Sequence, residues 1–128
     1  MIQQFVKDTE NTITSSSIVL SSTIQKYFDS ALTTVYIKGH LVIIDSSILE
    51  IALFATESRE TLSIDKYRVH YMNSTGQMLF RYDNAPHHPE INTYPHHKHT
   101  PDKVSPSDLP SLKDILSEIS AIIIGKQM

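Results

Sequence analysis

The pattern of apolar and polar positions changes character near residue 17. Before it, Ile2, Phe5 and Val6 recur at helical spacing among polar residues, which predicts a short amphipathic helix over residues 2–11. After it, β-branched and aromatic residues form short runs separated by polar pairs, a pattern typical of strands. We predict strands over residues 17–26, 33–44, 48–56, 64–72 and 77–83. The short connections favour an antiparallel meander.

The C-terminal segment returns to helical spacing. Its apolar positions follow an i, i+3, i+4, i+7 pattern: Leu112, Ile115, Leu116, Ile119, Ile122 and Ile123. Ser111, with Asp114 three residues later, resembles a capping box and indicates where this helix begins. The sequence therefore predicts an α+β fold, in which an antiparallel sheet of about five strands carries an N-terminal and a C-terminal helix on its apolar face.

Alternation within the strands assigns side chains to the two faces of the sheet. The apolar face receives Val35, Ile37, Leu41 and Ile43 from one strand and Leu49, Ile51 and Leu53 from the next. Keeping both sets on one face requires an odd connection at residues 45–47, because a slip of one residue would exchange the faces. The other face would then display Lys38, His40, Glu50, Lys66, Arg68, His70, Arg81 and Asp83.

The pairing of the last two predicted strands depends on the turn at residues 73–76. A four-residue turn there places Tyr71 across from Met78 and, further along, Arg68 across from Arg81. Two arginines in direct opposition destabilise a sheet unless an anion or a carboxylate lies between them. This register therefore predicts a site for a phosphate or an internal carboxylate.

Composition narrows the class of protein. The 128 residues are sufficient for a single domain, 1–128, and 40% hydrophobic with 20% charged residues is ordinary for a globular protein. A net charge of -3 argues against nucleic-acid binding by bulk electrostatics, although not against a local basic surface. The absence of cysteine excludes disulfides and thiolate ligands. With neither a signal-peptide pattern nor a membrane-spanning run, we expect a soluble cytoplasmic protein.

Histidine and proline concentrate in the segment after the last predicted strand. Residues 84–99, NAPHHPEINTYPHHKH, hold five of the seven histidines and three of the six prolines, and we interpret residues 84–110 as a stiff loop. In a purely structural role, the histidines would bond backbone carbonyls and hold the loop onto the domain.

Two chemical interpretations of this loop remain open beside the structural one. In the first, metal-free acid–base catalysis cleaves RNA, with histidines transferring protons and cations binding the phosphate. The catalytic candidates are His70, His88 and His97, with Asp83 as an orienting carboxylate, and the substrate-binding candidates are Arg68, Arg81, Lys38 and Tyr94.

In the second interpretation, His88, His97 and His99 bind a divalent, zinc-like metal. His97 and His99 are two residues apart, so in an extended segment both side chains point the same way. In extended backbone, the side chains within each adjacent pair, His87-His88 and His96-His97, point in different directions. Spacing alone therefore does not decide between acid–base catalysis and metal binding.

Several strings within the chain resemble the TumE-like toxin family of prokaryotic toxin–antitoxin systems. The most specific are RYDNAPHHPE, residues 81–90, and PHHKH, residues 95–99, and YRVHY at residues 67–71 also agrees. The likeness extends over nearly the whole chain. Ser46 stands where the family usually has glycine, and Tyr94 where it often has phenylalanine.

This resemblance implies a type II toxin encoded beside a DNA-binding antitoxin of the helix-turn-helix type. A compact basic sheet flanked by helices is also similar to RelE-like messenger-RNA interferases, in architecture only. We therefore expect a ribonuclease that acts on RNA with no obligatory cofactor, and a homodimer is compatible with the pattern. The alternatives are a metal-dependent hydrolase or nucleotide-modifying enzyme, and a protein-binding module without catalysis.

Overall fold

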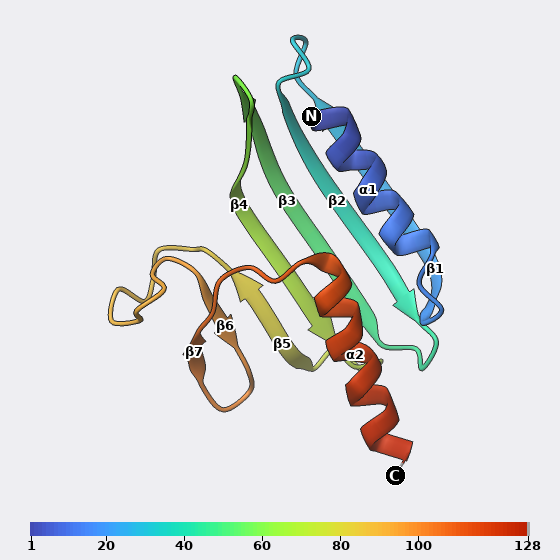
Figure 1. Cartoon of the computed structure of the whole chain (residues 1–128). Helices are drawn as coiled ribbons and strands as arrows, with labels where there is room; N and C mark the ends of the chain where they lie inside the picture. The colour runs from blue at the N-terminus through green and yellow to red at the C-terminus, as the bar shows by residue number, and fades with distance from the viewer. Residues whose placement is uncertain (128) are drawn as a thin grey trace.

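The computed structural model describes residues 1–127 and contains two helices and one sheet (Figure 1). Helix α1 spans Ile2–Thr14 and helix α2 spans Leu112–Gln127. The strands are β1 (Val19–Phe28), β2 (Thr34–Ile43), β3 (Ile48–Ser58), β4 (Thr61–Met72), β5 (Met78–Asp83), β6 (His97–His99) and β7 (Val104–Pro106). They lie in the sheet in chain order, and every neighbouring pair is antiparallel. The predicted α+β meander is confirmed.

The sheet has seven strands rather than about five, because the segment predicted to be a loop supplies two more. Strand β6 pairs with β5, which aligns Arg81 with His99 and Asp83 with His97, and β7 then pairs with β6. Each added strand has three residues, too few to show an alternating pattern in the sequence. The end of the histidine-rich segment, residues 97–99, is therefore a strand near the edge of the sheet. Only residues 84–96 of this segment form a loop.

Both helices lie on the same side of the sheet (Figure 1). Their buried residues, including Val6 and Ile13 of α1 and Ile115 and Ile119 of α2, join the predicted apolar face of the strands in one core. The predicted start of α2 is confirmed, since the Asp114 N–H donates to the Ser111 hydroxyl. The helices thus leave the opposite, polar face of the sheet uncovered by helix.

The connection from β2 to β3 keeps the two apolar sets on that core face, as predicted. Leu41 pairs with Leu49, and both are completely buried. Ser46, which stands where the resembled family usually has glycine, adopts a left-handed φ of 71°, a conformation that glycine reaches at lower cost. The neighbouring Ser47 hydroxyl contacts the Tyr71 hydroxyl at 2.7 Å and fixes the turn to β4.

The predicted register of β4 with β5 is wrong by two residues. Tyr71 pairs with Phe80 rather than Met78, because the ladder shifts between Tyr71 and Met72. Arg68 consequently faces Asp83, and Arg81 faces His70, so the two arginines are not opposed. Because the shift is an even number of residues, every side chain stays on its predicted face.

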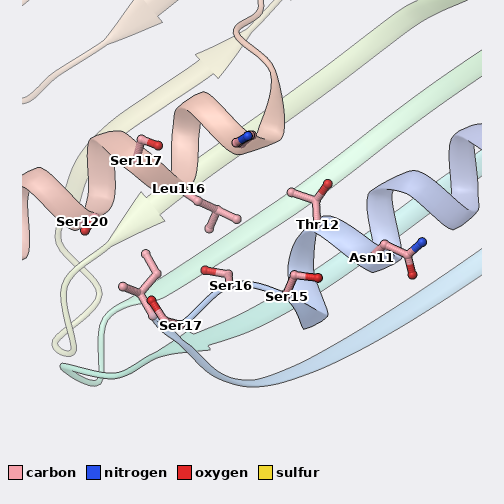
Figure 2. Close-up of a pocket in the computed structure, with 10 residues that line it drawn as sticks. Asn11, Thr12, Ser15, Ser16, Ser17, Leu116, Ser117 and Ser120 are labelled. Carbon is pink, nitrogen blue, oxygen red and sulfur yellow. The ribbon is translucent and has the colours of Figure 1, made fainter.

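The groove between the two helices is lined mainly by hydroxyl groups. Figure 2 shows Thr12 and Ser15 near the end of α1, across from α2 with Ser117 and Ser120. The hollow that they line has a volume of about 530 Å³. Among residues 1–127, Lys113 is the one ionisable residue of its lining. This groove lacks the chemistry that the sequence pointed to, which lies on the other face of the sheet. None of the helices within residues 1–127 is long and apolar enough to cross a membrane.

Candidate functional site

The polar face of the sheet arranges its ionisable side chains in two adjacent rows that run across the strands. Strand pairing aligns His40, Glu50, His70, Arg81 and His99 in one row, and Lys38, Ala52, Arg68, Asp83 and His97 in the other. Neighbouring strands are about 4.8 Å apart, so groups from five strands come within reach of one another. The meander thus gathers residues that are up to 61 positions apart in the chain.

The first part of this site is a groove over β2, β3 and β4, which we call the β2–β4 groove. Its volume is about 560 Å³, and its lining includes Lys38, His40, Glu50, Arg68 and His70. Ala52 lies between Lys38 and Arg68 and also lines the groove. Its short side chain leaves space between the two cations. Tyr36 of β2 and Thr23 and Gln25 of the neighbouring β1 also line the groove.

His70 is the most constrained histidine of the groove. The Arg68 guanidinium lies 3.2 Å from His70 Nδ1, and because a guanidinium can only donate, this nitrogen must hold the lone pair. Burial, followed by the positive charges of Arg68 and Arg81, lowers the pKa of His70, against the opposing effect of Glu50. Its Nε2 is buried and has no hydrogen-bond partner within residues 1–127. His70 is therefore neutral near pH 7.

His40 and Glu50 form the opposite side of the groove. They are directly paired across β2 and β3, and the Glu50 Oε1 atom lies 3.9 Å from His40 Nδ1. Both side chains are about half exposed, so they can reach a molecule that enters the groove.

The second part of the site is the histidine cluster, which consists of His88, His97 and His99, with Asp83 beside them. His97 is only 2% exposed, and its Nε2 lies 2.9 Å from Asp83 Oδ1. The other nitrogen, Nδ1, lies 2.8 Å from the Pro95 carbonyl. Both ring nitrogens of His97 therefore face oxygen acceptors.

The Asp83 carboxylate contacts two of the three histidines of the cluster, His97 and His99. Burial alone would raise its pKa, but the Ala85 N–H, the Arg81 guanidinium and His97 together hold the pKa below its usual value. Arg81 Nε donates to Asp83 Oδ2 at 2.8 Å, and His99 Nε2 lies 3.6 Å from the same oxygen. Asp83 is thus an ionised, almost fully buried group.

His88 reaches the cluster from the loop between β5 and β6. Its ring packs edge-on against His97 and His99, with centroids 5.2 Å and 5.5 Å away, while those of His97 and His99 are 4.6 Å apart. The Nδ1 atom of His88 pairs with the Glu90 carboxylate at 3.1 Å. In each of the three rings, one nitrogen lies within 4.8 Å of a nitrogen of both other rings.

The rest of the loop is tied to β4 rather than to the site. Asn84 accepts a hydrogen bond from the Tyr67 N–H and donates one to the Asp65 carbonyl. Burial, with the Asp83 and Asp108 carboxylates, raises the pKa of Tyr67 to about 12. The Tyr67 hydroxyl therefore stays protonated, and it forms a hydrogen bond with His96 Nδ1 at 2.9 Å. His96 thus anchors the loop, through a side-chain hydroxyl rather than the backbone carbonyl that the structural interpretation expected.

The structure divides the residues that the sequence pointed to between the two parts of the site. The groove contains Lys38, Arg68 and His70; the cluster contains Asp83, His88, His97 and His99; Arg81 lies between them. Tyr94 is exposed on the loop, outside the groove lining.

Sequence reasoning missed His40, Glu50, Ala52 and Glu90 as parts of this site. His40 and Glu50 had been assigned to the polar face, and their direct pairing was a signal that could have selected them. Ala52 and Glu90 gave no such signal, because a small residue in a strand and an exposed loop acid are both common.

The fold and the site together define a small α+β protein whose helix-free face carries paired histidines and cations. A family described as Toxin TumE matches residues 9–126, and the chain therefore belongs to the TumE toxin family. Neither the curated proteins nor the solved structures contain a match. The resemblance seen in the sequence is thus confirmed, and membership of a toxin family implies a cognate antitoxin.

Proposed function

We propose that this toxin acts on RNA as a ribonuclease and that the reaction takes place in the β2–β4 groove. The observation that carries the proposal is a repeated pair: β2 presents Lys38 and His40, and β4 presents Arg68 and His70, on either side of β3. Each pair offers one cation for a phosphate and one imidazole for a proton. Such a set is what cleavage of RNA by its own 2′-hydroxyl requires.

The two imidazoles differ in a way that suits opposite roles. His70 is neutral and its Nδ1 holds a lone pair, so it is the candidate base that removes the proton of the 2′-hydroxyl. His40, beside the Glu50 carboxylate, is the candidate acid that protonates the leaving 5′-oxygen. Strand spacing separates the two backbones by about 10 Å, which leaves room for one phosphodiester between the side chains.

Arg68 links substrate binding to activation of the base. In the free protein its guanidinium occupies the lone pair of His70 Nδ1. A phosphate is a stronger acceptor than an imidazole for a guanidinium, so a bound phosphodiester would draw Arg68 away and release that lone pair. Lys38, across Ala52, would bind the same phosphate from the other side.

The charge and the aromatic residues of the groove also support RNA as the substrate. The whole chain carries a net charge of -3, but two of its cations face each other across this groove. Tyr36 lines the groove and is partly exposed, so its ring can stack on an unpaired base. This favours single-stranded RNA over a duplex.

His88 and His97, candidates for acid–base catalysis on sequence grounds, have a smaller part in this proposal. His97 is buried and both of its nitrogens have partners, so it offers no free atom to a substrate. His88 faces His97 and His99 rather than the groove lining. We assign both residues to the histidine cluster, next to the groove.

The test is expression of the toxin in bacteria, followed by incubation of purified protein with RNA. We expect growth arrest and RNA cleavage with the wild type, and neither with Arg68→Ala or His70→Ala. The matched control is His87→Ala, because this exposed histidine lies outside both parts of the site. If the folded wild type leaves RNA intact, the proposal is wrong.

We further propose that the cognate antitoxin is a DNA-binding protein of the helix-turn-helix type. Support comes from membership of the toxin family and from the resemblance discussed above. Co-expression with the neighbouring open reading frame should abolish growth arrest and yield a stable complex. Growth arrest that persists despite expression of that protein would contradict this pairing.

A further inference from the structure

The histidine cluster has a geometry that the proposed reaction does not use. The Nδ1 atom of His97 faces a carbonyl and that of His88 faces a carboxylate, so in neutral rings both Nδ1 atoms donate. The Nε2 atoms then carry the lone pairs. One nitrogen of each ring, His99 included, lies within 4.8 Å of a nitrogen of the other two. Three imidazole nitrogens therefore converge on one small volume.

A carboxylate borders the same volume. Asp83 Oδ1 lies 2.9 Å from His97 Nε2, and Asp83 Oδ2 lies 3.6 Å from His99 Nε2. Ligands of a tetrahedral zinc ion are about 3.3 Å apart, as follows from bond lengths of about 2.0–2.1 Å. The two separations, which involve different oxygens of Asp83, lie on either side of that value. The carboxylate is thus close enough to His97 and His99 to share an ion with them.

Such a gathering of acceptors favours a positive charge. Lone pairs of three imidazoles beside an ionised carboxylate repel one another, and Asp83 and His97 are only 5% and 2% exposed, while His88 and His99 are partly exposed. A proton on His97 would satisfy only the contact with Asp83. A divalent ion would satisfy all four groups at once.

The surrounding contacts are those that orient metal ligands. A ligating histidine commonly donates its second N–H to a carboxylate or a backbone carbonyl, which fixes the ring and its tautomer. Here the Glu90 carboxylate is the partner of His88 and the Pro95 carbonyl is the partner of His97. Arg81 holds the Asp83 carboxylate in place.

We propose that His88, His97 and His99 bind one transition-metal ion of the zinc class, with Asp83 as the fourth ligand. Imidazole and carboxylate donors suit zinc and its neighbours rather than magnesium or calcium. The ligands come from the end of β5, from β6 and from the loop between them, so the ion ties residues 84–96 to the sheet edge. This inference does not depend on the ribonuclease proposal.

The first experiment titrates tag-free protein, stripped of metal by a chelator, with Zn²⁺ in a calorimeter and with Co²⁺ under visible spectroscopy. We expect one ion per chain, a tetrahedral Co²⁺ spectrum and a rise in the melting temperature, because an ion that binds only the folded chain stabilises it. Saturation below one ion per chain, or a spectrum of octahedral Co²⁺, would overturn the proposal.

Variants then locate the ion. His88→Ala and His99→Ala should abolish stoichiometric binding, and Glu90→Ala, which removes only the partner of His88, should weaken it by about 10–100-fold. His87→Ala is the matched control, because it removes a histidine one position away from a ligand and should bind as tightly as the wild type. Circular dichroism verifies that each variant is folded. If His88→Ala and His87→Ala bind the ion equally well, the cluster is not the site.

The outcome separates this inference from the proposed function. Protein without bound metal that still cleaves RNA would support a metal tying the loop to the sheet, outside the chemistry of the groove. Failure of RNA cleavage together with stoichiometric, His88-dependent binding would contradict the ribonuclease and leave the metal site standing.

Discussion

The β2–β4 groove and the histidine cluster lie on the same face of one sheet, yet their side chains are in opposite states. In the groove, Lys38, His40 and Arg68 are exposed, and His70 has one buried nitrogen without a partner within residues 1–127. In the cluster, Asp83 and His97 are nearly inaccessible and their polar atoms are paired with other protein groups.

The contrast shows why density of histidines is a poor guide to catalysis. The five histidines of residues 84–99 attract attention in the sequence, but the ones that are best satisfied are the least available to a substrate. His40 and His70, which stand alone in their strands, line the open groove. The two regions differ in how accessible their side chains are and in whether the polar atoms have hydrogen-bond partners. The number of histidines does not distinguish them.

The largest effect should follow from loss of the proposed base. We expect His70→Ala to lower the rate of RNA cleavage by about 10²–10⁴-fold, the range that general acid–base catalysis contributes. The measurement is single-turnover cleavage of a labelled RNA, with thermal unfolding as the check on folding. His87→Ala is the control. If the folded variant cleaves RNA at the wild-type rate, His70 is not the base and the β2–β4 groove is not the catalytic site.

Loss of His97 should act on stability instead. The substitution His97→Ala leaves a cavity and removes one partner of the buried Asp83 carboxylate, and a buried polar group that loses its partner typically costs about 1–3 kcal/mol. We expect a loss of free energy of unfolding at the upper end of that range, measured by urea denaturation in the presence of a chelator.

The same measurement on His40→Ala sharpens this contrast, because His40 is about half exposed and its loss should change stability by at most about 0.5 kcal/mol. Equal losses of stability in His97→Ala and His40→Ala would mean that the two regions do not differ in the way proposed.

The two regions also differ in how far the sequence could predict them. The faces of β2, β3 and β4 followed from alternation, which depends only on the period of the strand, so Lys38, Arg68 and His70 were assigned correctly to the polar face. The register of β4 with β5 depends on local turn chemistry. The side-chain oxygen of Asn73 accepts three hydrogen bonds at the turn, and the adjacent ladder is irregular, which no periodic pattern encodes.

The histidine cluster could be predicted only in part from local sequence patterns. The two-residue spacing of His97 and His99 predicts that they share a face, and they do so on β6. That His88 closes on them depends on how the loop of residues 84–96 folds back, and that Asp83 faces His97 depends on a strand too short to predict. The folding of this loop against a strand of three residues is a tertiary feature, and the sequence pattern could not predict it.

An intermediate effect should result from filling the floor of the groove. Ala52 lies between Lys38 and Arg68, so the side chain of Ala52→Leu would occupy the space of the proposed phosphate. We expect cleavage to fall by about 10–100-fold, since displacement of a substrate by about 1 Å can cost 10²-fold. Activity is measured with the same labelled RNA, and melting temperature should change little because the site is on the open face.

A second substitution separates blockage from a general effect on the sheet. Phe54 lies on the same face of the same strand and is exposed, and it is outside the groove lining. Phe54→Leu should therefore preserve cleavage. Wild-type activity in Ala52→Leu would show that no substrate group needs the space over Ala52.

The smallest effect is a shift of the pH profile. Glu50 raises the pKa of His70, while burial and the two arginines lower it below the ordinary histidine value. A base must be deprotonated to act, so activity should be present above the pKa of His70 and lost as the pH falls through it. Removing the Glu50 charge in Glu50→Gln lowers this pKa further, and the acidic limb of the profile of kcat/KM should move to lower pH.

A matched variant checks that the shift belongs to the charge of Glu50. The control Glu60→Gln changes an exposed residue between β3 and β4 and should leave the acidic limb in place. An acidic limb that moves upward in Glu50→Gln would contradict the assignment of His70 as the base.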